Sequence, residues 1–373
     1  MVVFSGKKEV KLDREIKLGS LKLEQKMSYK YLGLELDRLW KWKKVKDRMI
    51  EKARKRIAAL CGAGIKQGLS VAAAVKGWEV LVRPVLEYGC EIWGGGRWDE
   101  VERLQNALGR RILGVSRMTS RAAVRGELGW WRMEARRDLA RLRFWGKLVL
   151  MDESRIVKRI YKERRRMMYA GRGGDSGNWL QYTRKLLVEL GLEGEWNKEE
   201  VGTRQQWGAK ITTAIAKREE KLWWEEVVSK PKLRTYLLLK TKLSFEPYLN
   251  CGDSWRRSGL TQLRVGTNML NIERGRWEKK KVEERICHVC STNQVEDEMH
   301  FLLDCSVYDG VRQNLYNKLD NEKYDIKIAG GDKMKLLNVL IGEETRRQSR
   351  RVTQIIMRCI QRIATIRNRY ANK

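Results

Sequence analysis

The hydrophobic pattern of the chain changes near residue 40. Before this point apolar and polar residues alternate, at 16–18, 21–23 and 30–36, as they do along half-buried strands. After it, apolar residues recur every three or four positions, which is the spacing of one face of a helix. The pattern therefore predicts a mainly α protein with a short β-ribbon at its N-terminal end.

The first strong helical stripe starts just after Trp40. Its apolar residues are Val45, Met49, Ala53, Ile57 and Leu60, and lysine and arginine fill its other faces. The run Cys61–Gly64 is expected to end this helix, because glycine readily adopts the left-handed conformation of a closing turn. Further helical segments are expected at 69–78, 81–93, 99–113, 179–192, 205–230, 233–243, 258–280, 311–319 and 332–341.

The last helix, at 347–370, has the most regular pattern. Its apolar stripe consists of Val352, Ile355, Ile356, Cys359, Ile360, Ile363 and Ile366. The preceding flank and the other faces carry Arg346, Arg347, Arg350, Arg351, Arg358, Arg362, Arg367 and Arg369. We interpret the stripe as a packing surface or a surface for a protein partner, and the arginines as phosphate contacts or a solvated face.

Glycine-rich residues 171–177 (GRGGDSG) give the clearest domain boundary. The pattern divides the chain into five parts. They are a β segment (1–39), a helical domain (40–151), a basic helical connector (152–254), a cysteine–histidine module (255–315) and C-terminal amphipathic helices (316–373). The connector contains the basic cluster Lys158–Arg166. We interpret that cluster as a phosphate contact, a weak nuclear-import signal or a solvated helix face.

Charge is the strongest compositional feature of the chain. Lysine and arginine number 79 against 47 aspartates and glutamates, which gives a net charge of +32. Such an excess repels itself in a compact body unless a polyanion is close, so we expect RNA, DNA or both as partners. The sequence has no run of about 20 apolar residues that would span a bilayer, so we expect no membrane partner.

The N-terminal residues and the cysteines bear on location. The start, MVVFSGKKEV, lacks the apolar core of a signal peptide. Seven cysteines, an odd number, fit reduced thiols. We therefore expect an intracellular protein, in the nucleus rather than the cytoplasm.

Candidate metal ligands gather in the segment Glu284–Arg312. Cys287, Cys290, His300 and Cys305 have the spacing C-x2-C-x9-H-x4-C. The first pair brings two thiolates onto one ion from a tight turn, and the second pair completes a tetrahedron. Three thiolates and one imidazole suit one Zn²⁺ ion and leave no position for a catalytic water, so we expect a structural zinc site.

Two other ligand sets are open. His288 can replace one of the cysteines, or Cys251 can supply a thiolate from outside the segment. Both sets are less economical than the compact one. The remaining alternative is that the four residues are free and have this spacing by chance.

A longer pattern surrounds these ligands. It reads GRW-x6-ERICHVC-x5-EDEMHFLLDCSVYDGVR, preceded by further residues from Leu260 onward. This pattern resembles the C-terminal cysteine–histidine segment of non-LTR (LINE-like) retrotransposon reverse transcriptases, which host genes derived from such elements also carry. The run from Glu296 through His300 and Cys305 to Arg312 makes the likeness specific.

A second stretch is similar to the same family. Residues Val82–Trp93 (VRPVLEYGCEIW), followed by Arg110–Gly114, resemble the thumb of these reverse transcriptases, which holds the template–primer duplex. The resemblance implies a thumb-like domain at 40–151.

The N-terminal segment carries a third likeness. Met1–Phe4 looks like the end of the polymerase palm, and Tyr31, Leu32 and Gly33 look like the hairpin that supports the primer terminus. On this resemblance the segment 1–39 is an end-of-palm, primer-grip-like piece. It also implies that the sequence begins just after the metal-binding carboxylates of the polymerase.

Arginines in the basic segments are the candidate phosphate contacts. They are Arg110, Arg111, Arg164, Arg165, Arg166, Arg285, Arg312, Arg358 and Arg362. Contacts of this kind grip RNA or DNA largely without base specificity.

The sequence contains no complete active site. It has no adjacent Asp-Asp pair, and the three prolines are followed by Val85, Lys232 and Tyr248, so it has no Pro-Asp pair either. Polymerases hold two metal ions between aspartates, two of them adjacent in reverse transcriptases, and the C-terminal nuclease of some non-LTR elements is built around a Pro-Asp pair. We therefore expect no enzyme activity from the isolated chain, but a nucleic-acid-binding, zinc-containing remnant of a reverse transcriptase. Two alternatives remain: a truncated part of an active RNA-directed DNA polymerase, and a host protein-interaction module.

Overall fold

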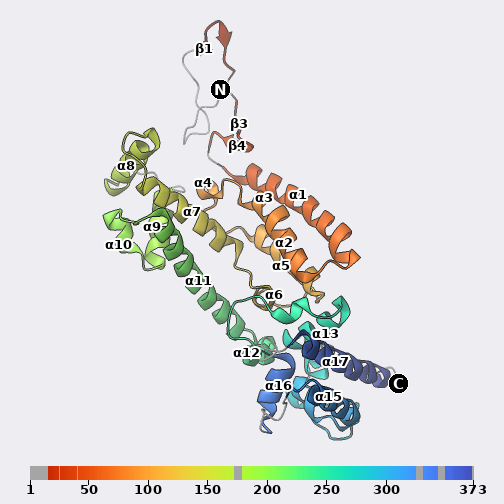
Figure 1. Ribbon diagram of the computed structural model, residues 1–373. Helices are drawn as coiled ribbons and strands as arrows, with labels where there is room; N and C mark the ends of the chain where they lie inside the picture. The colour runs from red at the N-terminus through yellow and green to blue at the C-terminus, as the bar shows by residue number, and fades with distance from the viewer. Residues whose placement is uncertain are drawn as a thin grey trace. The chain divides into compact units, whose positions relative to one another are not determined.

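The computed structural model describes residues 16–24, 26–39, 41–171, 179–324, 331–342 and 349–371. Within them the chain is mainly helical, with two short antiparallel strand pairs near the N-terminal end (Figure 1). The predicted fold class is therefore confirmed. None of the described helices is long and apolar enough to cross a membrane. Met1–Phe4, glycine-rich residues 172–177, Arg346 and Arg347 lie outside the described residues.

The strands form two small ribbons. Strand β1 (Lys17–Leu18) pairs with β2 (Leu21–Lys22), and β3 (Ser28–Tyr31) pairs with β4 (Leu34–Asp37). The tip of the second ribbon is Leu32 and Gly33, whose φ angles of 45° and 86° are both left-handed. A two-residue turn of this kind matches the twist of paired strands. The hydroxyl of Tyr88 donates to the carbonyl of Leu32 at 2.7 Å, which holds the tip in place.

Packing divides the chain into two compact units. The first unit consists of Met1–Ala59, Gly77–Glu102 and Met133–Ile215. The second unit consists of Leu60–Lys76, Arg103–Arg132 and Ala216–Lys373. Two helices, α5 (Asp99–Leu113) and α11 (Arg204–Val228), begin in the first unit and end in the second.

Tryptophan fills the core of the first unit. Trp145 stacks on Trp196 at a centroid distance of 5.6 Å and meets Trp207 at 5.2 Å. Gly146 leaves room for Trp207, because a Cβ atom there would lie 2.2 Å from the indole. The helices of this unit are α1 (Lys43–Ala59), the π-helix η3 (Trp78–Val82), α3 (Arg83–Glu87), α4 (Cys90–Trp93), α7 (Met133–Val149), α8 (Ile156–Tyr169), α9 (Trp179–Glu189) and α10 (Glu193–Lys198).

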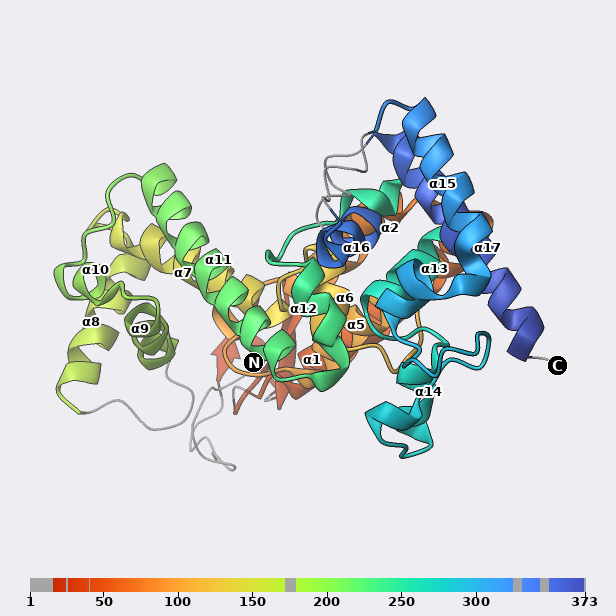
Figure 2. The ribbon, with the colours of Figure 1, turned by 90° about the horizontal axis from the view of Figure 1, so that it is seen from below.

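The second unit contains the predicted metal ligands. Its longer helices are α2 (Val71–Gly77, whose last residue falls in the first unit), α6 (Arg121–Leu128), α12 (Arg234–Leu239), α13 (Ser254–Arg264), α14 (Asn271–Trp277), α15 (Asp309–Asn321), α16 (Lys333–Ile341) and α17 (Arg350–Ala371). Single turns lie at η1 (Leu60–Gly64), η2 (Ile65–Gln67), η4 (Pro231–Leu233), η5 (Pro247–Asn250), η6 (Val282–Glu284), η7 (His300–Asp304) and η8 (Ser306–Tyr308). Helices α13 and α15 both pack against α17, as Figure 2 shows for α15 and α17.

Several predicted helix boundaries were wrong, including that of 81–93, where Gly89, with φ 66°, separates α3 from α4. The helical turns after α1 do not stop at Cys61–Gly64 but continue through η1 and η2 to Gln67. The left-handed residue that closes them is Gly68, with φ 86°. The segment 258–280 is not one helix, because the chain leaves the helical path after Arg264 and starts again at Asn271. Gly266, with φ 61°, lies in this break.

The stripe of α17 is mostly buried within its own unit. Val352, Ile356 and Ile363 are at most 3% exposed, whereas Ile355 and Ile366 are half-buried. Arg367 was expected on the outer face with the other arginines, but it is 5% exposed and pairs with Glu296. A protein partner of this helix would therefore meet mainly its arginine face.

A fully buried charge network holds the middle of the second unit together. The guanidinium of Arg264 donates to Glu127 at 3.0 Å and pairs with Glu246 at 3.2 Å. Glu246 also accepts from Lys240, and all four side chains are at most 1% exposed. Because buried charges are stable only when paired, removal of one member would strongly destabilise the rest.

Candidate metal centre

A short hairpin-like segment carries the first two cysteines. Ile286 and Val295 form an antiparallel bridge, and the amide of Cys287 donates to the carbonyl of Gln294 at 2.8 Å. The chain reverses between them, where Asn293 has a φ of 51°. Backbone pairing thus fixes Cys287, and the turn returns Cys290 toward it.

A single π-turn carries the other two ligands. His300 opens η7, and the amide of Cys305 donates to the carbonyl of His300 at 2.9 Å. This wider turn lets residues five positions apart approach one point, which the 3.6-residue repeat of an α-helix would not do. The amide of His300 donates to Asp297 at 2.8 Å and thereby fixes the start of the turn.

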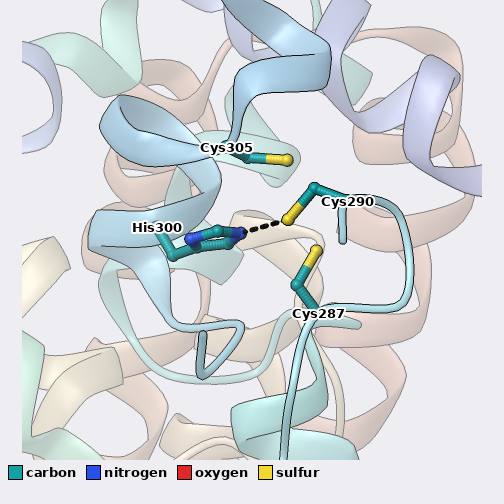
Figure 3. A group of neighbouring side chains, drawn as sticks. All are labelled: Cys287, Cys290, His300 and Cys305. Carbon is teal, nitrogen blue, oxygen red and sulfur yellow. Dashed lines mark hydrogen bonds between the residues drawn. The ribbon is translucent and has the colours of Figure 1, made fainter. Parts of the chain in front are cut away.

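These two segments bring the four predicted ligands together. Their sulfur and nitrogen atoms lie within 4.8 Å of one another, and Figure 3 shows the three thiols and the imidazole facing one point. The sulfur of Cys290 lies 3.4 Å from Nε2 of His300. Cys287, His300 and Cys305 are buried, and Cys290 is half-buried. The cluster is therefore a possible metal site made of the compact ligand set.

Gln294 orients the imidazole. Its side-chain oxygen lies 2.9 Å from Nδ1 of His300. A proton on Nδ1 directed to this oxygen leaves the lone pair of Nε2 facing the thiols, which is the tautomer that a metal ligand needs. The sequence pattern did not identify Gln294, because its role depends on the hairpin that returns it to His300.

Burial favours the neutral form of most of these groups. It raises the pKa of Cys287, and it raises the pKa of Cys305 to about 12. Burial also lowers the pKa of His300, although Asp297 and Asp304 oppose the change. At Cys290, burial is outweighed by hydrogen bonds from Thr292 and the neighbouring thiols, so the pKa is lowered. A cation bound among the three thiols would therefore favour the loss of their protons.

Two buried acidic residues between the ligands anchor the segment. Glu296 accepts from Arg367 of α17 at 2.5 and 2.7 Å. Glu298 accepts from Arg234 of α12 at 2.8 Å and from Thr235 at 2.9 Å. Both carboxylates are 1% exposed. They fall in the acidic run that the sequence pattern contained, but only the fold reveals their partners.

The two alternative ligands lie outside the cluster. His288 is exposed, and its Nδ1 accepts from the side chain of Asn271 at 2.7 Å. Cys251 is buried, and burial raises the pKa of its thiol. Neither residue belongs to the group of close ligand atoms in the described part of the chain.

The candidate phosphate-binding arginines have different surroundings. Arg111, Arg164, Arg166, Arg358 and Arg362 are exposed. The other four donate to backbone carbonyl groups of the protein: Arg110 to Thr119, Arg165 to Trp196, Arg285 to Ile272 and Lys280, and Arg312 to Cys305. Arg312 is also 6% exposed. Its side chain therefore supports the candidate metal ligands from α15 and does not form part of an exposed contact surface.

Comparison with known proteins adds no relative. The chain matches no protein-family model, and no curated protein sequence is significantly similar to it.

Proposed function

We propose that the chain is a nucleic-acid-binding protein with one structural zinc ion. The observation that carries this proposal is a basic groove of about 550 Å³ between α15 and α17, in the same unit as the metal cluster. Its cationic lining residues are Lys318, Arg351, Arg358 and Arg362. Amide side chains of Asn314, Asn321 and Gln354 stand among them.

The arginines of this groove are available to an outside anion. Arg351 pairs with Glu322 at 2.8 Å, but its side chain remains 77% exposed. Arg358 and Arg362 are exposed, with no ion-pair partner among the described residues. Guanidinium groups bind phosphate oxygens in pairs, and amides donate to sugar and phosphate oxygens. Such a lining suits a sugar–phosphate backbone of RNA or DNA.

Zinc is the metal that the ligand set favours. Three thiolates and one imidazole are soft to borderline ligands and form a closed tetrahedron. All four positions are filled by protein, so the ion would stabilise the fold and would not activate water.

The metal cluster supports the groove. Arg312 of α15 donates to the carbonyl of Cys305 at 2.6 Å, and Arg367 of α17 pairs with Glu296. The two helices that form the groove are thus both fastened to the cysteine–histidine segment. A bound ion would fix their relative position.

We further propose that the chain is a remnant of a LINE-like reverse transcriptase without its own catalytic site. The support is the sequence pattern around Cys287–Arg312 and the thumb-like phrase at Val82–Trp93. The absence of an Asp-Asp pair from the sequence argues against polymerase activity of this chain. RNA or DNA as the partner favours a nuclear location.

Binding to labelled RNA and DNA at several salt concentrations tests the proposed function. The affinity of the wild type is expected to fall steeply with salt. The double variant Arg358→Gln/Arg362→Gln is expected to reduce the slope of log K against log salt by about 2. Arg184→Gln with Arg204→Gln, two exposed arginines of the first unit, is the charge-matched control. Equal slopes for the two double variants, or no binding by the wild type, would contradict the proposal. Native mass spectrometry before and after mild acid tests for one bound zinc ion.

A further inference from the structure

A second basic cavity lies in the second unit and shares no lining residue with the α15–α17 groove. Its volume is about 520 Å³. Cationic side chains reach it from α5, from the start of α6, from both sides of Pro231 and from α14. They are Arg110, Arg117, Arg121, Lys230, Lys232 and Arg276.

The carboxylates near this cavity do not balance these charges. Of the described residues that line it, Glu226 alone is acidic, and its carboxylate already accepts from Arg125 at 2.5 Å. Arg276 pairs with Glu273 at 3.3 Å, but Glu273 is also paired with Arg234 at 2.8 Å. The cavity therefore keeps a large positive excess.

Three of the cations have neither an ion-pair partner nor a side-chain hydrogen bond among the described residues. They are Arg117, Arg121 and Lys230, and all three are exposed. Arg110 and Lys232 donate to the carbonyl oxygens of Thr119 and Met118, at 2.7 and 3.3 Å, which orients the two side chains without neutralising them.

The cations also raise one another's energy. Burial and the charge of Arg121 lower the pKa of Arg110. Burial lowers the pKa of Lys232, with Arg276 adding to the change and Glu273 opposing it. Like charges held this close are unfavourable without an anion, so the arrangement costs stability in the free protein.

Neutral groups at the cavity also suit an anion. Thr119 lines it and is 1% exposed, and its hydroxyl has no hydrogen-bond partner in the part of the chain that the structure describes. Ser120 precedes α6, but its side chain makes no capping bond to the first turn. The start of a helix carries free amide groups and a partial positive charge, which favour a phosphate.

We propose that this cavity binds backbone phosphates of a nucleic acid strand. The proposal rests on the proposed function and gives it a second contact point. Its volume falls within the range of about 300–1,000 Å³ that is typical of small-molecule sites. The cavity is therefore larger than a single phosphate group requires. A concave set of cations fits a chain of phosphates that enters it, whereas a flat membrane surface would meet only its rim.

The test compares Arg117→Gln/Arg121→Gln/Lys230→Gln with Arg184→Gln/Lys185→Gln/Arg204→Gln in the full chain. Both variants lose the same charge from exposed positions, but only the first set lines the cavity. Fluorescence anisotropy measures the binding of a labelled single strand and of a duplex between low and moderate salt. The cavity variant is expected to bind roughly tenfold or more weakly at 0.1 M salt, as an order of magnitude, and to lose about 2 to 3 from the salt slope. The control is expected to stay within about threefold of the wild type.

The outcomes separate this inference from the proposed function. A wild type that binds, with the cavity variant equal to the control, overturns the phosphate site and leaves the proposed function intact. A wild type that binds neither RNA nor DNA overturns both. The inference would also be overturned if the wild type bound anionic vesicles and the cavity substitutions weakened this vesicle binding but not the binding of nucleic acids.

Discussion

The metal cluster and the basic cavity of the second unit are built in opposite ways. The four metal ligands lie within 19 residues of sequence, between Cys287 and Cys305, and their neighbours lock them into one arrangement. The cations of the cavity come from positions as far apart as Arg110 and Arg276, and several repel one another. The first arrangement would stabilise the protein once an ion is bound. The second opposes stability, because like charges are held together without matching carboxylates.

Loss of a metal ligand should have the largest effect. We expect Cys287→Ser to abolish stoichiometric zinc in native mass spectrometry and to unfold the cysteine–histidine segment, because metal binding in small zinc modules supplies on the order of 10 kcal/mol. Limited proteolysis should then cleave within 271–308. The matched control is Cys251→Ser, a buried cysteine outside the cluster. Retention of one zinc ion by Cys287→Ser would refute the assigned ligand set.

The buried pair of Glu296 and Arg367 should rank second. Glu296→Gln leaves Arg367 buried without its partner, and we expect the free energy of unfolding to fall by about 3 kcal/mol. Urea denaturation of the zinc-loaded protein measures this loss. Arg274→Gln breaks an exposed pair with Glu278 and should cost less than about 1 kcal/mol. Equal losses for the two variants would show that the Glu296–Arg367 pair does not anchor the segment.

The hydrogen bond from His300 to Gln294 should have a smaller effect, on the metal alone. We expect Gln294→Ala to weaken zinc affinity by roughly 10- to 100-fold, because the second ring nitrogen loses the group that fixes its tautomer. Competition with a chromophoric chelator provides the measurement. Asn293→Gly, at a left-handed position of the same turn, should leave the affinity nearly unchanged.

A lower pH should weaken zinc binding at the cysteine–histidine segment but leave nucleic-acid binding at the basic cavity unchanged. Zinc must displace protons from thiols, and burial raises the pKa values of Cys287 and Cys305, so zinc affinity should fall as the pH is lowered from 8 to 6. Arginines remain charged over this range, so the contribution of Arg117 and Arg121 to nucleic-acid binding should stay constant. Nucleic-acid binding is measured on the zinc-loaded protein at each pH. Zinc affinity is measured at each pH by competition titration with a chelator. A zinc affinity that does not change with pH would contradict thiolate ligation.

The smallest effect expected is on stability, at the basic cavity. Arg121→Gln removes a charge that repels Arg110, so the free energy of unfolding should stay within about 0.5 kcal/mol or rise slightly. Affinity for nucleic acid should fall at the same time. A clear loss of stability would mean that Arg121 serves the fold and not a ligand.

The sequence by itself determined the helical class, most helix positions and the leading set of candidate metal ligands. Helical periodicity and a cysteine–histidine spacing within a few turns are local properties, since short loops cost little chain entropy to close and leave few geometries open. Helix α5 begins and ends at the predicted residues, Asp99 and Leu113. The ligand cluster likewise contains the four residues that the spacing indicated.

Only the tertiary structure decided which charged residues are buried and which are free. Arg312 and Arg367 look like their exposed neighbours in sequence, but the fold places one on the Cys305 carbonyl and the other on Glu296. The basic cavity has no sequence signature, because its cations lie on separate helices and loops. The free energy of a charge depends on its burial and on the other charges around it, and both are set by contacts between distant parts of the chain.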